Sequence, residues 1–454
     1  MNDITAIFAF LRYCLGHKGN MSKIVARMDW QELYSFASKQ AILGLCFDGI
    51  ERLGKEYPEE LKRNPIGREL LMNWMGKAQQ IRSQNMKVNA VAGKLFSMLR
   101  EDGMRCCVLK GQGNALMYPD PYSRTPGDID VWINASRERI MEYASKKFEL
   151  GDDIRLQHLE TSLDGVPVEL HFFPCSMNNP IYHTRLQKWF RRNADLQCSN
   201  VVSLPDGAGD IAIPTTAFNV VYQLCHLYHH FFDEGIGMRQ IIDYYYVVCD
   251  FYKVYQNSSK THPSSLTLKG GSTSTPSPSS SEGGDVTALR CSEPLRSKDG
   301  GSSKVSPGCA GWDRLDGSGD MTSDASASSA STTDSSASTA LDVVQSDLKH
   351  LGFWKFAGTV MYVLHEALGL SEEKMIAPMD EKRGKLLLAE ILNGGNFGQH
   401  FTKYGHFTQQ GMAKKYFLKI WRNMHFVRYY PAEALSEPIF RTWHFFWRMK
   451  NKRS

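Results

Sequence analysis

A short block of strand-like segments, set between long helical stretches, most constrains the fold of this chain. Apolar residues are continuous in residues 105–109 and alternate with polar ones in 128–133, which is typical of buried and half-buried strands. Residues 154–163 and 166–173 flank Asp164-Gly165, a dipeptide that favours a two-residue hairpin turn. These segments predict a small mixed sheet with short helices between its strands.

Helical periodicity surrounds this block on both sides. Asp29 is predicted to cap a helix that continues through Leu45, and Ser136 and Thr215 or Thr216 are predicted to cap two later helices. The predicted fold class is therefore α+β, a small mixed-sheet α/β core flanked by helical regions. The predicted parts are an N-terminal helical region of residues 1–103, an α/β core of residues 104–213, and a C-terminal helical domain of residues 214–256 and 341–454.

Residues 257–340 differ in composition from the rest of the chain. Ser, Thr, Gly, Pro and Ala dominate this segment, and large aliphatic residues are rare. Such a segment cannot bury enough apolar surface to offset the entropy that is lost on ordering. It is predicted to be a disordered insertion within the C-terminal helical domain.

The composition narrows the class of protein. Hydrophobic residues make up 42% of the chain, which supports real cores, and a net charge of +5 makes no strong case for nucleic acid. The ten cysteines form no CxxC pair, so a zinc site with clustered thiolates is not indicated. The N-terminus lacks a basic region before its apolar residues, and no uncharged run approaches the length of a membrane span. We therefore expect a cytoplasmic protein with reduced thiols.

Three carboxylates in the predicted sheet indicate a metal site. Asp128 and Asp130 are two residues apart on a strand, so their side chains share one face. Glu169 lies in the second strand of the predicted hairpin, on the face opposite to its apolar neighbours. Like charges in one place repel each other, and a divalent ion offsets that repulsion. Each carboxylate alone fits an exposed strand face or turn better than a metal site, but the three together predict a shared ion.

A glycine turn precedes these carboxylates. Lys110-Gly111-Gln112-Gly113 directly follows a predicted buried strand and leads into a short helix. Backbone N–H groups in such a turn, with the Lys110 ammonium, suit a phosphate group. The turn is not a P-loop, because the GxxxxGK[ST] spacing is missing.

Taken together, these motifs resemble an uncharacterised bacterial nucleotidyltransferase family. The resemblance is carried by Val108-Leu109-Lys110-Gly111, Arg124, Asp128-Ile129-Asp130 and Val168-Glu169-Leu170-His171. It extends over residues 25–255 and 345–445. The chain departs from most nucleotidyltransferases in having Lys110-Gly111 at the turn and a long, proline-rich loop before Asp128.

The resemblance implies a reaction and a set of residue roles. Asp128, Asp130 and Glu169 would hold Mg²⁺ or Mn²⁺ on a nucleoside triphosphate, and Glu169 would complete the metal site or accept a proton. A hydroxyl acceptor of unknown identity would attack the α-phosphorus, and pyrophosphate would leave. The phosphates would be positioned by Lys110, Gly111, Gly113 and Arg124.

Other residues are weaker candidates. His171, Arg239 and Asp243 are expected to contact substrate, although Arg239 and Asp243, four apart on a helix, also suit a simple ion pair. A histidine group spaced by three and four residues, His226, His229 and His230, favours a structural role, because no carboxylate or cysteine accompanies it at ligand spacing.

Two alternative functions stay open at this point. The chain could be a non-catalytic nucleotide-binding module with the same fold. It could also be a nucleic-acid- or membrane-associated partner protein that uses its aromatic, basic C-terminal residues, although aromatic residues at helical spacing are more often part of a core.

Overall fold

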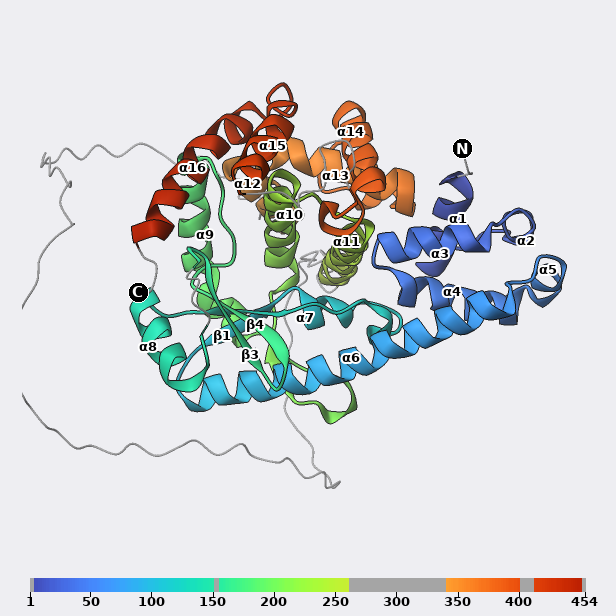
Figure 1. Cartoon of the computed structure of the whole chain (residues 1–454), viewed down its shortest axis with the longest axis horizontal. Coiled ribbons are helices and arrows are strands. Elements are labelled where there is room, and N and C mark those ends of the chain that lie inside the picture. Colours follow the sequence, from blue (N-terminus) through green and yellow to red (C-terminus); the bar gives the residue numbers. More distant parts are fainter. Residues whose placement is uncertain (1–3, 151–154, 261–339, 401–411, 451–454) are drawn as a thin grey trace, which may run out of the picture. The chain divides into compact units, whose positions relative to one another are not determined.

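The computed structural model describes residues 4–150, 155–260, 340–400 and 412–450 (Figure 1). Most of the predicted insertion, residues 261–339, lies outside the described residues. Its predicted boundaries are wrong by a few residues, because residues 257–260 still belong to helix α11 and Ala340 already begins helix α12.

The N-terminal part is helical, as predicted. It contains α1 (Ile4–Cys14), α2 (Ser22–Val25), α3 (Trp30–Lys39), α4 (Leu43–Glu56), α5 (Pro58–Arg63) and α6 (Arg68–Glu101). Asp29 caps α3, because its carboxylate accepts a hydrogen bond from the Glu32 backbone N–H. The predicted continuation to Leu45 is wrong: the positive φ of 57° at Ala41 ends the helix, and α4 begins after it.

The predicted mixed sheet is confirmed. Its strands are β1 (Cys106–Leu109), β2 (Ile129–Ile133), β3 (His158–Leu163) and β4 (Val166–His171), in the order β1-β2-β4-β3. β2 and β4 run parallel, and the two outer pairs are antiparallel. The hairpin forms as predicted: Asp164 and Gly165 have φ of 50° and 72°, which suits a two-residue primed turn.

Short elements connect and extend this sheet. They are α7 (Gly111–Ala115), η1 (Pro121–Ser123), α8 (Arg137–Lys147), α9 (Pro180–Ser199) and η2 (Pro205–Gly207), with a second, two-stranded sheet of β5 (Val201–Ser203) and β6 (Asp210–Ala212). Ser136 caps α8, as predicted, by accepting a hydrogen bond from the Arg139 backbone N–H.

Helices cover both faces of the four-stranded sheet. On one face, Val108, Val131 and Leu170 share a hydrophobic core with residues of α6 and α8, and α6 runs along the sheet in Figure 1. On the other face, Trp132 contacts the rings of Phe190 in α9 and Phe218 in α10. This second face also carries the acidic residues, because Asp130 is two positions from Trp132.

The C-terminal part is again helical. It contains α10 (Thr216–Asp233), α11 (Met238–Lys260), α12 (Ala340–His350), α13 (Trp354–Leu368), η3 (Glu372–Lys374), α14 (Glu381–Gly394), η4 (Asn396–Gly398), α15 (Met412–Met424) and α16 (Pro431–Lys450). Thr215 stands at the cap position of α10, as predicted, but its side chain does not cap the helix, because its hydroxyl and its N–H both bond to Gln197 Oε1.

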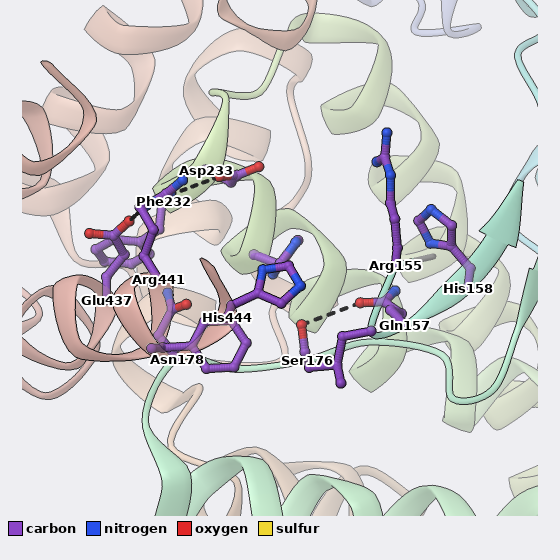
Figure 2. Close-up of a pocket in the computed structure, with 13 residues that line it drawn as sticks. Arg155, Gln157, His158, Ser176, Asn178, Phe232, Asp233, Glu437, Arg441 and His444 are labelled. Carbon is purple, nitrogen blue, oxygen red and sulfur yellow. Dashed lines mark hydrogen bonds and ion pairs between the residues drawn. The ribbon is translucent and has the colours of Figure 1, made fainter. Parts of the chain in front are cut away.

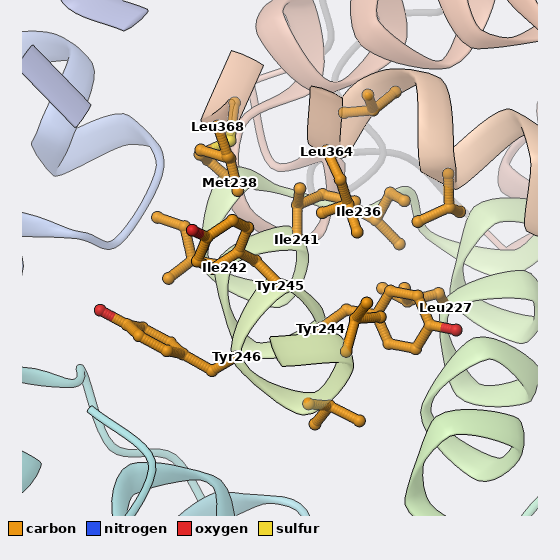
Figure 3. Close-up of a cluster of buried hydrophobic side chains, with 14 of the residues drawn as sticks. Leu227, Ile236, Met238, Ile241, Ile242, Tyr244, Tyr245, Tyr246, Leu364 and Leu368 are labelled. Carbon is orange, nitrogen blue, oxygen red and sulfur yellow. The ribbon is translucent and has the colours of Figure 1, made fainter. Parts of the chain in front are cut away.

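The N-terminal and C-terminal helices share one hydrophobic core. Phe10 of α1 and Leu33 of α3 belong to the same buried cluster as Ile242 of α11 and Leu364 of α13. Figure 3 shows the C-terminal share of this cluster, with residues of α10, α11 and α13 directed toward one another. Among the described residues, no helix is long and apolar enough to cross a membrane.

Candidate active site

Strands β2 and β4 bring the three predicted carboxylates together. Asp130 of β2 is paired in register with Glu169 of the parallel strand β4, so their side chains are neighbours on one face. Asp128 lies just before β2, two residues from Asp130. One carboxylate oxygen from each of the three lies within 4.8 Å of the others. The group therefore has a spacing at which a single metal ion can be bound.

Asp130 is the buried member of this group, with 3% of its surface exposed. Lys110 Nζ lies 3.0 Å from its Oδ2, and His171 Nε2 donates to its Oδ1 at 2.9 Å. Burial raises the pKa of Asp130, but these two neighbours outweigh it and hold that pKa well below its usual value. Asp130 is therefore an anion without any metal.

Asp128 differs from Asp130 in its surroundings. It is exposed, and the nearby Asp130 carboxylate, together with desolvation, raises the pKa of Asp128 to about 6. Glu169 is half-buried. Burial raises the pKa of Glu169, but the hydrogen bond from His171 and nearby positive charge outweigh it, and the net shift is downward. The open side of the group is thus at Asp128.

His171 joins two of the carboxylates. Its Nε2 lies 2.9 Å from Asp130 Oδ1 and 3.1 Å from Glu169 Oε2, and the residue is 2% exposed. Burial lowers the pKa of His171, but the two carboxylates outweigh burial and raise it to about 9. His171 was expected to contact substrate, and it lies among the carboxylates themselves.

Lys110 approaches the carboxylates from a strained turn. Its φ is 53°, unusual for a residue with a side chain, and it stands just before α7. Its Nζ contacts Asp130 and donates to His226 Nε2 at 2.8 Å. Burial lowers the pKa of Lys110, but Asp130 and Asp128 outweigh burial and raise it. The ammonium is therefore held beside the acidic group.

The two glycines of the turn have different neighbours. Gly111 has a φ of 40°, and a Cβ added to it would lie 3.8 Å from the backbone oxygen of Asp128. A Cβ on Gly113 would lie 2.9 Å from the side chain of Ile213. Both residues line a cavity of about 650 Å³. Gly111 is thus beside the carboxylates, whereas Gly113 is required for close packing against Ile213.

His226 is a site residue that the sequence did not single out as functional. It lies on α10, which covers the acidic face of the sheet, and His230 Nε2 lies 3.0 Å from its Nε2. Burial, followed by the charge of Lys110, lowers the pKa of His226 well below its usual value. A neutral His226 can accept the hydrogen bond from Lys110. Histidine spacing was visible in the sequence, but its partner Lys110 is 116 residues away.

Arg124 and Asp243 form a buried ion pair. Arg124 Nε and Nη2 donate to the two carboxylate oxygens of Asp243, each at 2.8 Å, and the hydroxyl of Tyr118 donates to Asp243 at 2.7 Å. Burial raises the pKa of Asp243, and Arg124 outweighs it and lowers the pKa. Arg124 was expected to bind phosphate, but two nitrogens of its guanidinium already donate to Asp243.

Arg239 does not form the ion pair with Asp243 that its spacing suggested, within the described parts of the chain. It donates from Nη1 to the backbone oxygen of Thr125 at 3.2 Å, and a Cβ on Gly127 would lie 3.8 Å from that same nitrogen. Its Nε has no hydrogen-bond partner among the described residues. Arg239 is therefore a cation next to the loop that ends in Asp128.

A second group of possible ligands shares Glu169. His158 of β3, His171 and Glu169 each offer one atom within 4.8 Å of the others. His158 Nδ1 lies 3.4 Å from Glu169 Oε2, and neither of its ring nitrogens has a hydrogen-bond partner among the described residues. Burial, followed by the charge of His171, lowers the pKa of His158 to about 4. His158 was not predicted, because only the pairing of β3 with β4 brings it to Glu169.

A cavity of about 180 Å³ adjoins His158. His158 and Arg155 stand on one side of it, and Asp233 and Glu437 stand on the other, with His444 of α16 between them (Figure 2). The cavity is built from β3, the segment after β4, α10 and α16, so no local sequence pattern predicts it.

The comparisons with known proteins identify a family. A family model described as an uncharacterised nucleotidyltransferase matches residues 26–254, which is half of the chain. No curated protein matches the chain. The matched range contains the three carboxylates, Lys110, His158 and His171.

Proposed function

This chain belongs to the uncharacterised nucleotidyltransferase family, and we propose that it transfers a nucleoside monophosphate from a nucleoside triphosphate to a hydroxyl acceptor. The transfer depends on Mg²⁺ or Mn²⁺ held by Asp128, Asp130 and Glu169. The acceptor oxygen attacks the α-phosphorus, its proton passes to solvent, and pyrophosphate leaves. The observation that carries this proposal is the group of three carboxylates within 4.8 Å on adjacent strands.

The chemistry of the donor set fits this kind of ion. All three groups are carboxylates, and hard divalent ions such as Mg²⁺ and Mn²⁺ prefer oxygen ligands. Asp128 is exposed, whereas Asp130 is buried, so the set is open on one side. A bound ion would neutralise phosphate charge and orient the reacting group.

The residues around the carboxylates supply positive charge and position. Lys110 holds Asp130 at 3.0 Å and lies directly before Gly111, which approaches the backbone of Asp128. We assign Lys110 and Gly111 to the phosphates. Arg239 suits the same task better than Arg124, because Arg124 is bound to Asp243 through two nitrogens whereas Arg239 Nε has no described partner.

The direct test is transfer of label from nucleotide to acceptor. The protein is incubated with Mg²⁺, a cell extract and each nucleoside triphosphate labelled at the α-phosphorus. We expect wild type to transfer label and Asp130→Asn to lose the activity while it still folds, as a cooperative thermal melt shows. The absence of transfer and of pyrophosphate release with every nucleotide would refute the proposal.

A matched variant controls for the loss of a carboxylate. Asp164→Asn removes a negative charge from the turn between β3 and β4, where Asn-Gly favours the same conformation. The ion pair that it removes, with Lys94, is half-exposed and contributes little to stability. We expect Asp164→Asn to transfer label at the wild-type rate. Mg²⁺-dependent nucleotide binding without transfer would favour a non-catalytic nucleotide-binding module instead.

A further inference from the structure

His158 is a buried side chain whose hydrogen-bonding capacity is unused. It is 8% exposed, and neither Nδ1 nor Nε2 has a hydrogen-bond partner among the described residues. Buried polar groups in folded proteins nearly always have a partner, so such a group indicates a missing water, ion or ligand. The atom that faces His158 Nδ1 is Glu169 Oε2, at 3.4 Å.

The spacing around Glu169 Oε2 matches the coordination shell of a transition ion. Two ligand atoms that are each about 2.1 Å from an ion, at angles between tetrahedral and octahedral, lie about 3.0–3.4 Å from each other. Glu169 Oε2 is 3.1 Å from His171 Nε2 and 3.4 Å from His158 Nδ1. Both distances to Glu169 Oε2 therefore suit a shared ion, and all three ligand atoms lie within 4.8 Å of one another.

The far side of the His158 ring has the surroundings that a metal ligand needs. Histidine ligands usually direct their second nitrogen toward a carboxylate or carbonyl, which fixes the orientation of the ring. His158 Nε2 lies 3.8 Å from Glu160 Oε1, which Arg155 holds at 2.6 Å. The ring also borders the cavity of about 180 Å³.

We propose that His158, Glu169 and His171 bind a second divalent ion of the zinc type, distinct from the Mg²⁺ or Mn²⁺ of the carboxylate group. Imidazole nitrogens favour Zn²⁺, Co²⁺ and similar ions over Mg²⁺, which prefers oxygen alone. Glu169 belongs to both groups, so it would serve as a ligand of both ions. The second site does not require nucleotidyl transfer, so it stands or falls separately from the proposed function.

Binding changes the protonation and the contacts of His171. An ion on Nε2 displaces into solvent the proton that this nitrogen shares with Asp130 and Glu169. The ring keeps a proton on Nδ1, and the Gln157 amide, whose nitrogen lies 3.4 Å from Nδ1, turns its oxygen toward that proton. Asp130 retains Lys110 at 3.0 Å as its neighbour of opposite charge. The second ion thus replaces one positive neighbour of the carboxylates with another.

Cobalt reports this site directly, because nitrogen ligation gives Co²⁺ distinct absorption in the visible range. The full-length protein is titrated with Co²⁺ alone, and the visible spectrum and the number of ions bound are measured. We expect two ions in wild type. We expect His158→Asn to weaken the binding of the ion that gives the nitrogen-type spectrum by about tenfold or more.

Two further variants make the test specific. Asp128→Asn removes a ligand of the carboxylate group alone and is expected to keep the nitrogen-type spectrum. His229→Asn removes a histidine from the same cavity but outside the metal group, and we expect wild-type binding. If His158→Asn fails to fold, as shown by its melting temperature, His158→Gln replaces it. A His158 variant that folds and binds Co²⁺ with the stoichiometry, affinity and spectrum of wild type would overturn the proposal.

Discussion

Arg124 donates hydrogen bonds from two nitrogens to the two oxygens of Asp243, each at 2.8 Å, although 119 residues separate them. The pair ties the loop before β2 to helix α11, and both side chains are about 5% exposed. Because this loop ends at Asp128, the ion pair also determines where the first carboxylate of the site lies. The pair therefore supports the position of the site's first carboxylate.

Breaking this pair should destabilise the protein strongly. Asp243→Ala leaves Arg124 as a buried charge without its partner, which costs about 3–5 kcal/mol in comparable cases. Urea denaturation measures the change in the free energy of unfolding. Glu142→Ala removes the exposed ion pair with Lys146 and serves as the control, with no measurable change expected. A loss below about 1 kcal/mol for Asp243→Ala would show that the pair does not carry this role.

Removing the Lys110 ammonium should lower the rate of label transfer. Lys110→Met takes positive charge from Asp130 and from the proposed phosphate position, and the loss of one such group typically costs about 100-fold. Lys110→Arg should not restore the rate, because Nζ fits between partners at 3.0 and 2.8 Å and a guanidinium is wider. The surface variant Lys94→Met is the control. Wild-type transfer by Lys110→Met would exclude this role.

Two glycines of helix α6 should respond in opposite ways to the same change. A Cβ on Gly93 would collide with the backbone oxygen of Ala208, so Gly93→Ala should destabilise by about 1–3 kcal/mol. Gly76 has no atom within 4 Å of its Cβ position, so Gly76→Ala should stabilise by about 0.5–1 kcal/mol. The melting temperatures of both variants are compared with that of wild type. Equal shifts in melting temperature would contradict the packing that we describe.

Glu433 should make the protein less stable as the pH rises. Burial raises the pKa of Glu433 from 4.5 to about 7, despite hydrogen bonds from the backbone N–H groups of Asn178 and Asn179. The folded state therefore holds this proton more tightly than the unfolded state. This contribution is fully present below pH 4.5 and is lost as the pH rises through about 7.

The shift corresponds to about 3 kcal/mol over that range. It is measured as the change in the free energy of unfolding between pH 5 and pH 8 in wild type and in Glu433→Gln. Because every other titrating group is common to both proteins, the difference between their slopes isolates Glu433. Parallel slopes would show that Glu433 does not titrate in this window.

Local patterns predicted those elements whose signals lie within a few residues. Asp164-Gly165 predicted the hairpin because two residues with positive φ make that turn by themselves. Asp29 and Ser136 cap their helices through the N–H three residues later, so each cap is complete within one turn. The end of α3 and the hydrogen-bond partner of the Thr215 hydroxyl were not predicted. The end of α3 has no nearby Gly or Pro, and Thr215 bonds to Gln197 instead of its own helix.

The sequence by itself determined which residues are acidic, which face of each strand they occupy, and that the chain combines a small sheet with helices. These properties follow from the two-residue period of strands and from turn chemistry, which are local. Only the tertiary structure decided that β2 and β4 are adjacent and parallel, so that Asp130 meets Glu169 and β3 adds His158. It also decided that Arg124 pairs with Asp243, and that Lys110 contacts both Asp130 and His226. Which charged groups pair depends on their distance in space, and that distance is set only when the helices and the sheet pack together.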